Sequence, residues 1–132
     1  MTLEHKVYDA PELLGELLLF EIAPAYCRES GSLKAPSAAL PMGTVLMQNA
    51  DGTLGPWTPA APAAEGQTAE PDSGPVGVLL RDVQASSSNV DAPVLRRGAL
   101  VSASLLKWSA DTADEQKKAA LAALETVGIL AR

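Results

Sequence analysis

Short segments of alternating apolar and polar residues dominate the second half of the chain. Residues 76–80 place apolar side chains on one side of an extended backbone, which is typical of a strand with one buried face. A second short strand is expected at residues 92–96. Gly98 then breaks the chain, and a third alternating segment follows at residues 99–108.

The clearest helical pattern lies near the carboxyl end. Thr112 and Glu115 have the spacing of a capping box, and apolar residues follow at helical intervals. Gly128 is placed to end the helix in a left-handed conformation. The sequence therefore predicts one C-terminal helix over about residues 112–127, followed by a final strand at residues 129–131.

A hairpin is predicted in the first half of the chain. Residues 43–48 have the pattern of a strand, residues 49–52 that of a turn, and residues 53–58 that of a returning strand. Pro56 in the second arm has no backbone N–H to donate, which favours a position at the edge of a sheet.

Two stretches rich in proline and small residues are predicted to be irregular. Residues 23–39 contain Pro, Ser, Gly and Ala, and are interpreted as a connector. Residues 59–75 are a Pro/Ala-rich stretch with acidic residues and no basic one, which indicates an exposed loop. The predicted fold class is therefore α+β, a small β-rich domain with short strands, much irregular chain and one C-terminal helix.

The first 25 residues form a distinct amino-terminal segment. Its apolar run at residues 13–22 fits a helix or a strand equally well, and it is shorter than the roughly 20 residues that a membrane span needs. Exposed leucines at this density require cover from the domain, a sister subunit or a partner. The contact residues predicted here are Leu17, Leu18, Leu19, Phe20 and Ile22.

Composition narrows the classes of partner. The 132 residues fit one domain, and 16 Asp and Glu against 10 Lys and Arg give a formal charge of −6, which disfavours nucleic acid. Glu4, Asp9 and Glu12 argue against a signal peptide. Aromatic residues make up only 4% of the chain, so the core lacks large anchors and oligomerisation is expected to add stability.

Candidate chemistry is sparse. The only possible nucleophile–base pair of the Cys–His type is Cys27 with His5. An unremarkable thiol and an exposed imidazole are the favoured interpretation, and a hydrolase stays an alternative. No Cys/His spacing fits zinc, and no glycine-rich loop fits a phosphate. The sequence predicts neither an enzyme nor a cofactor or metal site.

The basic and aromatic residues have structural and functional interpretations. Arg96 and Arg97 are expected to pair with local carboxylates or with a neighbouring subunit rather than to clamp a ligand. Trp108 is expected to fill the core of an aromatic-poor domain. Trp57 and its surrounding loops leave open a carbohydrate-binding or adhesion module.

Several short motifs also occur in a characteristic order. They lie at residues 26–29, 43–46, 74–80, 94–98, 105–108, 119–124 and 128–129. Their order and spacing resemble those of the head decoration proteins of tailed bacteriophages, the family of phage lambda protein D. The resemblance covers about residues 26–132.

This resemblance implies a homotrimer on the outer surface of the virion, made in the host cytoplasm. Such trimers occupy three-fold and quasi-three-fold sites of the mature head, bind the major capsid protein and stabilise the shell against the pressure of packaged DNA. Residues 1–25 would then be a capsid-binding arm and residues 26–132 the decoration domain. Arg96, Arg97 and Trp108 become candidates for trimer contacts or internal packing.

Overall fold

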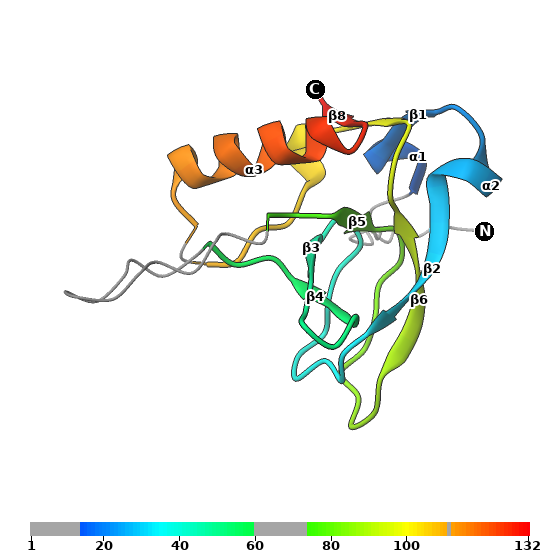
Figure 1. The fold of residues 1–132 in the computed structure, drawn as a ribbon, viewed down its shortest axis with the longest axis vertical. Coiled ribbons are helices and arrows are strands. Elements are labelled where there is room, and N and C mark those ends of the chain that lie inside the picture. The colour runs from blue at the N-terminus through cyan, green and yellow to red at the C-terminus, as the bar shows by residue number, and fades with distance from the viewer. Residues whose placement is uncertain (1–13, 60–73, 111) are drawn as a thin grey trace, which may run out of the picture.

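A five-stranded closed barrel forms the centre of the fold. The computed structural model describes residues 14–59, 74–110 and 112–132, and the barrel has the strand order β2-β4-β3-β5-β6 (Figure 1). Its strands are β2 (Arg28–Leu33), β3 (Val45–Gln48), β4 (Leu54–Pro56), β5 (Gly77–Leu79) and β6 (Val90–Leu95). The longest ladder is the antiparallel β2–β6 pair, which runs from Arg28 opposite Leu95 to Leu33 opposite Val90.

A small second sheet, with the order β1-β7-β8, lies at one end of the barrel (Figure 1). Its strands are β1 (Leu18–Glu21), β7 (Ala99–Val101) and β8 (Ile129–Ala131). β7 pairs antiparallel with β1 and parallel with β8. The helical elements are α1 (Leu14–Leu17), α2 (Pro24–Cys27), the 3₁₀ turn η1 (Ala103–Leu105) and α3 (Asp114–Thr126). No helix in the described ranges is long and apolar enough to cross a membrane.

Two apolar clusters fill the interior. The first joins the small sheet, α1 and α3, and includes the fully buried Leu17, Val101, Leu124 and Ile129. The second fills the barrel with side chains that include Leu33, Leu46, Leu79 and Val94. Because the residues in the first cluster come from both ends of the chain, the amino-terminal segment and the C-terminal helix stabilise each other.

The predicted fold class is confirmed, as is the hairpin. β3 and β4 pair antiparallel around a turn in which Gly52 has φ +88°. The predicted edge position of the second arm is wrong, because β4 also pairs with β2 through Leu33 and Leu54 and so closes the barrel. Most of the predicted loop at residues 59–75 lies outside the described residues.

The C-terminal helix is confirmed, but its cap is displaced. The helix begins at Asp114, and the N–H of Ala113 donates to the side-chain oxygen of Gln116 at 2.8 Å. The hydroxyl of Thr112 bonds to that of Ser109 instead, at 2.7 Å, so the predicted pairing of Thr112 with Glu115 is wrong. Gly128 has φ +92° at the end of the helix, and the final strand β8 follows as predicted.

Two other segments differ from prediction. The connector expected at residues 23–39 contains α2 and β2, because Pro24 stands in the first turn of a helix, where its missing N–H has no cost. The strand expected at residues 99–108 ends at Val101 and passes into η1. The sequence leaves helix and strand open for residues 13–22. In the described part of this run both occur, since α1 is followed directly by β1.

Gly98 provides a test of how tightly the two sheets are joined. Its φ is +67°, and an added Cβ would lie 3.1 Å from Cys27 Sγ and 3.2 Å from Ile22 Cδ1. We expect Gly98→Ala to destabilise the fold by about 2–3 kcal/mol, since strain from the left-handed backbone, about 1–2 kcal/mol, adds to the steric contact. Gly52→Ala has the same backbone strain with nothing within 4 Å. Equal urea midpoints for the two variants would show that the contact at Gly98 carries no energy.

Candidate functional site

Within the described residues, the groups considered for catalysis are not assembled into a site. The Cys27 side chain is fully buried, and its Sγ donates to the carbonyl oxygen of Gly98 at 3.4 Å. His5 lies outside the described residues. No group of three or more His, Cys, Asp or Glu side chains in the described ranges could hold a metal ion.

The two tryptophans pack against each other. Trp57 is 3% exposed, and its ring meets that of Trp108 edge to face, with centroids 5.9 Å apart. Trp108 packs against the same core cluster. Trp57 therefore offers no exposed ring face on which a sugar could stack, which removes the observation behind a carbohydrate-binding module.

Exposed apolar side chains gather where β1 leads into α2. Leu19 is 51% exposed, Phe20 61%, Ile22 67% and Tyr26 56%. We call these four residues the apolar patch. Four large exposed apolar side chains within eight residues of sequence are a feature typical of a protein contact surface.

A β-bulge explains why consecutive residues of β1 are exposed. Leu18 is opposite Val101 and Phe20 is opposite Leu100, so two residues of β1 correspond to one of β7. A bulge re-aims side chains in this way. The inward positions are filled by Leu17 and by Val101, both fully buried, which leaves Leu19 and Phe20 at the surface.

The apolar surface continues across the small sheet. Phe20 is paired with Leu100, and Leu100 is paired with Leu130, so the three residues form one row across three strands. Leu130 is 38% exposed and lines a groove of about 270 Å³ between β8 and α3, together with Leu121. The outer side of the sheet thus presents a row of three apolar residues, and the charged residues Lys118, Glu125 and Arg132 line the groove beside it.

Ion pairs within the chain surround the patch. Arg28 binds the carboxylate of Glu21 through both Nε and Nη2. Glu29 receives a hydrogen bond from Arg97 Nη2 at 2.7 Å, and Arg96 Nε lies 3.7 Å from its other oxygen. The bond from Arg97 holds the pKa of Glu29 below its usual value and raises that of Arg97, so these groups are charged and paired at neutral pH.

The predicted contact residues separate into two sets. Leu17, at 1% exposed, is a core residue and therefore not available to a partner, and Leu18 is partly buried against the same cluster. Leu19, Phe20 and Ile22 are at the surface. The structure therefore divides a run of similar residues into an inner half that holds the domain together and an outer half that faces solvent.

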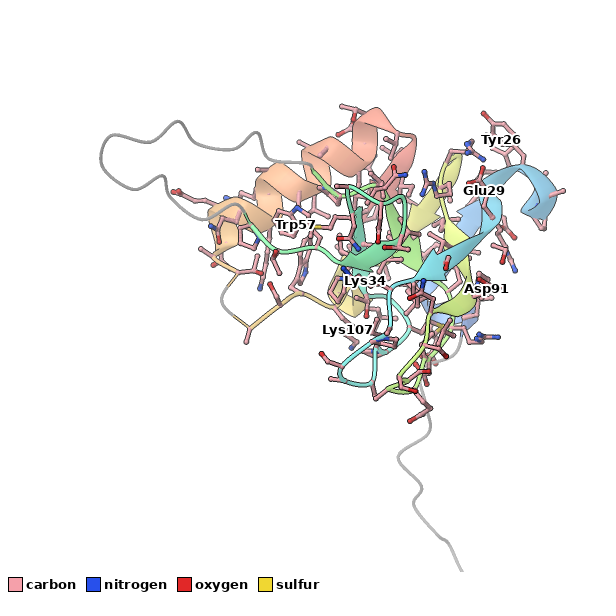
Figure 2. All side chains as sticks on the ribbon, turned by 60° about the horizontal axis from the view of Figure 1, so that its bottom comes forward. Tyr26, Glu29, Lys34, Trp57, Asp91 and Lys107 are labelled. Atoms are coloured by element: carbon pink, nitrogen blue, oxygen red, sulfur yellow. The ribbon has the colours of Figure 1, made fainter. Side chains whose placement is uncertain are left out.

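Tyr26 was missed as a contact candidate. Its ring lies on α2, and Arg97 reaches it from a position 71 residues later, with the guanidinium carbon 5.4 Å from the ring centroid. Figure 2 shows Tyr26 and Glu29 at the same end of the molecule. The only local signal is Pro24, whose fixed φ favours a first helical turn that brings Tyr26 back towards β1.

The chain matches the model of a known protein family. Residues 7–129 match the model described as bacteriophage lambda head decoration protein D. No curated protein matches the chain.

Proposed function

Because the chain belongs to the bacteriophage lambda head decoration protein D family, we propose that it is a capsid decoration protein that binds the mature head as a homotrimer. Its sites are the three-fold and quasi-three-fold positions of the shell, its partner is the major capsid protein, and it acts without catalysis. The virion surface is its place of action, after synthesis in the host cytoplasm.

The observation that carries this proposal is the apolar patch. A folded domain with a filled core has no internal use for Leu19, Phe20 and Ile22 at the surface, where each is more than half exposed. Burying a large apolar side chain contributes about 1.5–3 kcal/mol. The core already holds the small sheet and the segment that follows it in place. Three such side chains can therefore contribute binding energy without a large loss of conformational entropy.

The fold bears on where in the amino-terminal segment the proposed contact with the shell lies. Within the segment assigned to the arm, residues 14–21 form α1 and β1 and residues 24–25 begin α2. β1 pairs with β7, and Leu17 packs in the core. Residues 1–13 lie outside the described residues. We therefore place the proposed contact with the shell in the folded part of the segment, where the patch is presented at fixed positions.

Stabilisation would follow from mass action. A protein that binds the expanded lattice and not its disrupted form stabilises that lattice by its own binding free energy. In a trimer, the second and third patches attach at high effective concentration once the first has bound, so avidity exceeds the affinity of one patch by about 10²–10⁴. This multiplication allows a modest apolar surface to hold neighbouring capsid subunits together.

The direct test uses purified full-length protein and expanded shells that lack it. We expect sedimentation equilibrium to give a trimer at micromolar concentration, electron cryo-microscopy to place it at the three-fold sites, and decorated DNA-filled heads to rupture at a higher temperature than bare heads. A stable monomer that leaves rupture unchanged would refute the proposal. Equal binding to unexpanded shells would refute the part that concerns the mature lattice.

A further inference from the structure

Ile22 and Tyr26 form a distinct feature within the apolar patch. The N–H of Ile22 donates to the carbonyl oxygen of Gly98 at 3.0 Å. A Cβ built on Gly98 would lie 3.2 Å from Ile22 Cδ1 and 3.4 Å from Tyr26 Cε1. Both side chains therefore rest on the same bare backbone, and we call this pair the Ile22–Tyr26 knob.

Arg97 fixes the position of this knob. Its Nη1 donates to the carbonyl oxygen of Tyr26 at 2.6 Å, and its Nη2 donates to Glu29 Oε1 at 2.7 Å. The same guanidinium lies 5.4 Å from the centre of the Tyr26 ring, within the range of a cation–π contact. One arginine thus holds both the backbone and the ring of an exposed tyrosine.

An exposed aromatic side chain that is held in place is suited to binding. Tyr26 on α2 and Ile22 just before it are exposed large apolar side chains, at 56% and 67%. Tyrosine and arginine are enriched among the few residues that dominate binding energy. A side chain that is already ordered before docking avoids about 0.5–1.5 kcal/mol of ordering cost.

The charges around the knob identify the chemistry of the partner. Each guanidinium beside it is paired within the chain: Arg28 with Glu21, and Arg96 and Arg97 with Glu29. An acidic partner group would have to compete with Glu29, and a basic one with Arg97. A partner surface that brings no charge avoids both costs, because none of the internal pairs has to break.

We propose that the Ile22–Tyr26 knob is the anchor of the docking face, and that it seats in an apolar, uncharged pocket of the capsid subunit. Arg97 is a positioning residue that acts through Tyr26. This inference rests on the proposed decoration function and adds which residues carry it and what they meet. The contact depends on shape and burial, and the ion pairs only keep the knob in place.

The first test compares three full-length variants on shells that lack the protein. Tyr26→Ala should weaken binding by about 30-fold, the loss typical of a dominant contact residue, and Ile22→Ser should act in the same direction. Tyr26→Phe keeps the ring and should bind within about threefold of the wild type. Melting curves and sedimentation on each variant verify that the trimer is intact.

The second test separates positioning from direct contact by Arg97. Arg97→Ala should weaken binding by about five- to tenfold in the wild-type background and add almost nothing once Tyr26 is alanine, because coupled residues are not additive. If Arg97 instead binds a carboxylate of the capsid, Arg97→Ala should weaken binding by the same factor in both backgrounds. That factor should decrease as salt screens the pair between 0.05 and 0.5 M. That result would overturn the inference.

The remaining outcomes are distinct. Wild-type protein that does not bind shells refutes the decoration function and the anchor together. Wild-type binding with undiminished binding by Tyr26→Ala refutes the anchor alone. Dissociation of the Tyr26→Ala trimer into monomers would show that the knob meets a second copy of this chain, which overturns the capsid partner.

Discussion

Replacing Phe20 by glutamate should reduce binding to expanded shells by at least 100-fold and leave the melting temperature of the protein unchanged. Phe20 is 61% exposed and pairs with Leu100 on the outer side of the small sheet. Losing its burial removes about 1.5–3 kcal/mol, and an unpaired carboxylate enclosed in an apolar contact costs several kcal/mol more. About 3 kcal/mol in total already corresponds to more than a 100-fold change in affinity.

Ser87→Glu is the matched control, because it adds the same charge at an exposed position. Ser87 precedes β6 at the end where Val90 is opposite Leu33, whereas the patch adjoins the end where Leu95 is opposite Arg28. The two ends are roughly 17 Å apart along the strands. Binding measured by co-sedimentation with shells should be lost for Phe20→Glu only, and the reverse order would place the docking face at the far end of the barrel.

Local sequence signals predicted the elements whose stability is local. The turn with Gly52 and the helix end at Gly128 both need a positive φ, and glycine at a break in periodicity indicates this directly. The C-terminal helix follows from its apolar spacing alone. These features depend on contacts within a few residues, so one sequence is enough to find them.

β2 could not be predicted, because its stability comes from distant partners. Only Leu33 in it is buried, and Gly31 reads as a loop residue. A side chain at Gly31 would lie 2.7 Å from Leu54 Cδ1 and 2.9 Å from Val94 Cγ2, so the glycine is required by neighbours 23 and 63 positions away. The amino-acid composition of the segment therefore gives no indication of such contacts.

The candidate site was half predictable for the same reason. An unusual density of apolar residues indicated Leu19, Phe20 and Ile22, whereas the division between Leu17 and its neighbours depends on β1 pairing with β7 some 80 residues later. The clamp of Arg97 on Tyr26 also joins distant positions. The sequence alone showed that a run of apolar residues has to be buried against some surface. The fold shows which of these side chains are buried within the chain itself and which stay exposed.

Leu17→Ala should destabilise the protein by about 2–5 kcal/mol, the range for removing a fully buried leucine. Leu17 is 1% exposed and packs in the cluster that joins the small sheet and α3. Its carbonyl also accepts a hydrogen bond from the N–H of Ser102 at 2.8 Å, so the backbone around the new cavity is held in place and relaxes little. The measurement is the urea midpoint at a fixed protein concentration, since an oligomer's stability depends on concentration.

Leu19→Ala is the control that makes the result decisive, because it is the same substitution two positions later at a site 51% exposed. It should cost less than about 1 kcal/mol, as surface substitutions usually do, yet weaken shell binding. The two leucines thus have opposite expected effects: Leu17→Ala lowers stability, whereas Leu19→Ala lowers affinity. If both variants kept wild-type stability, residues 14–22 would be a detachable arm in solution, and the patch would not be held ready for docking.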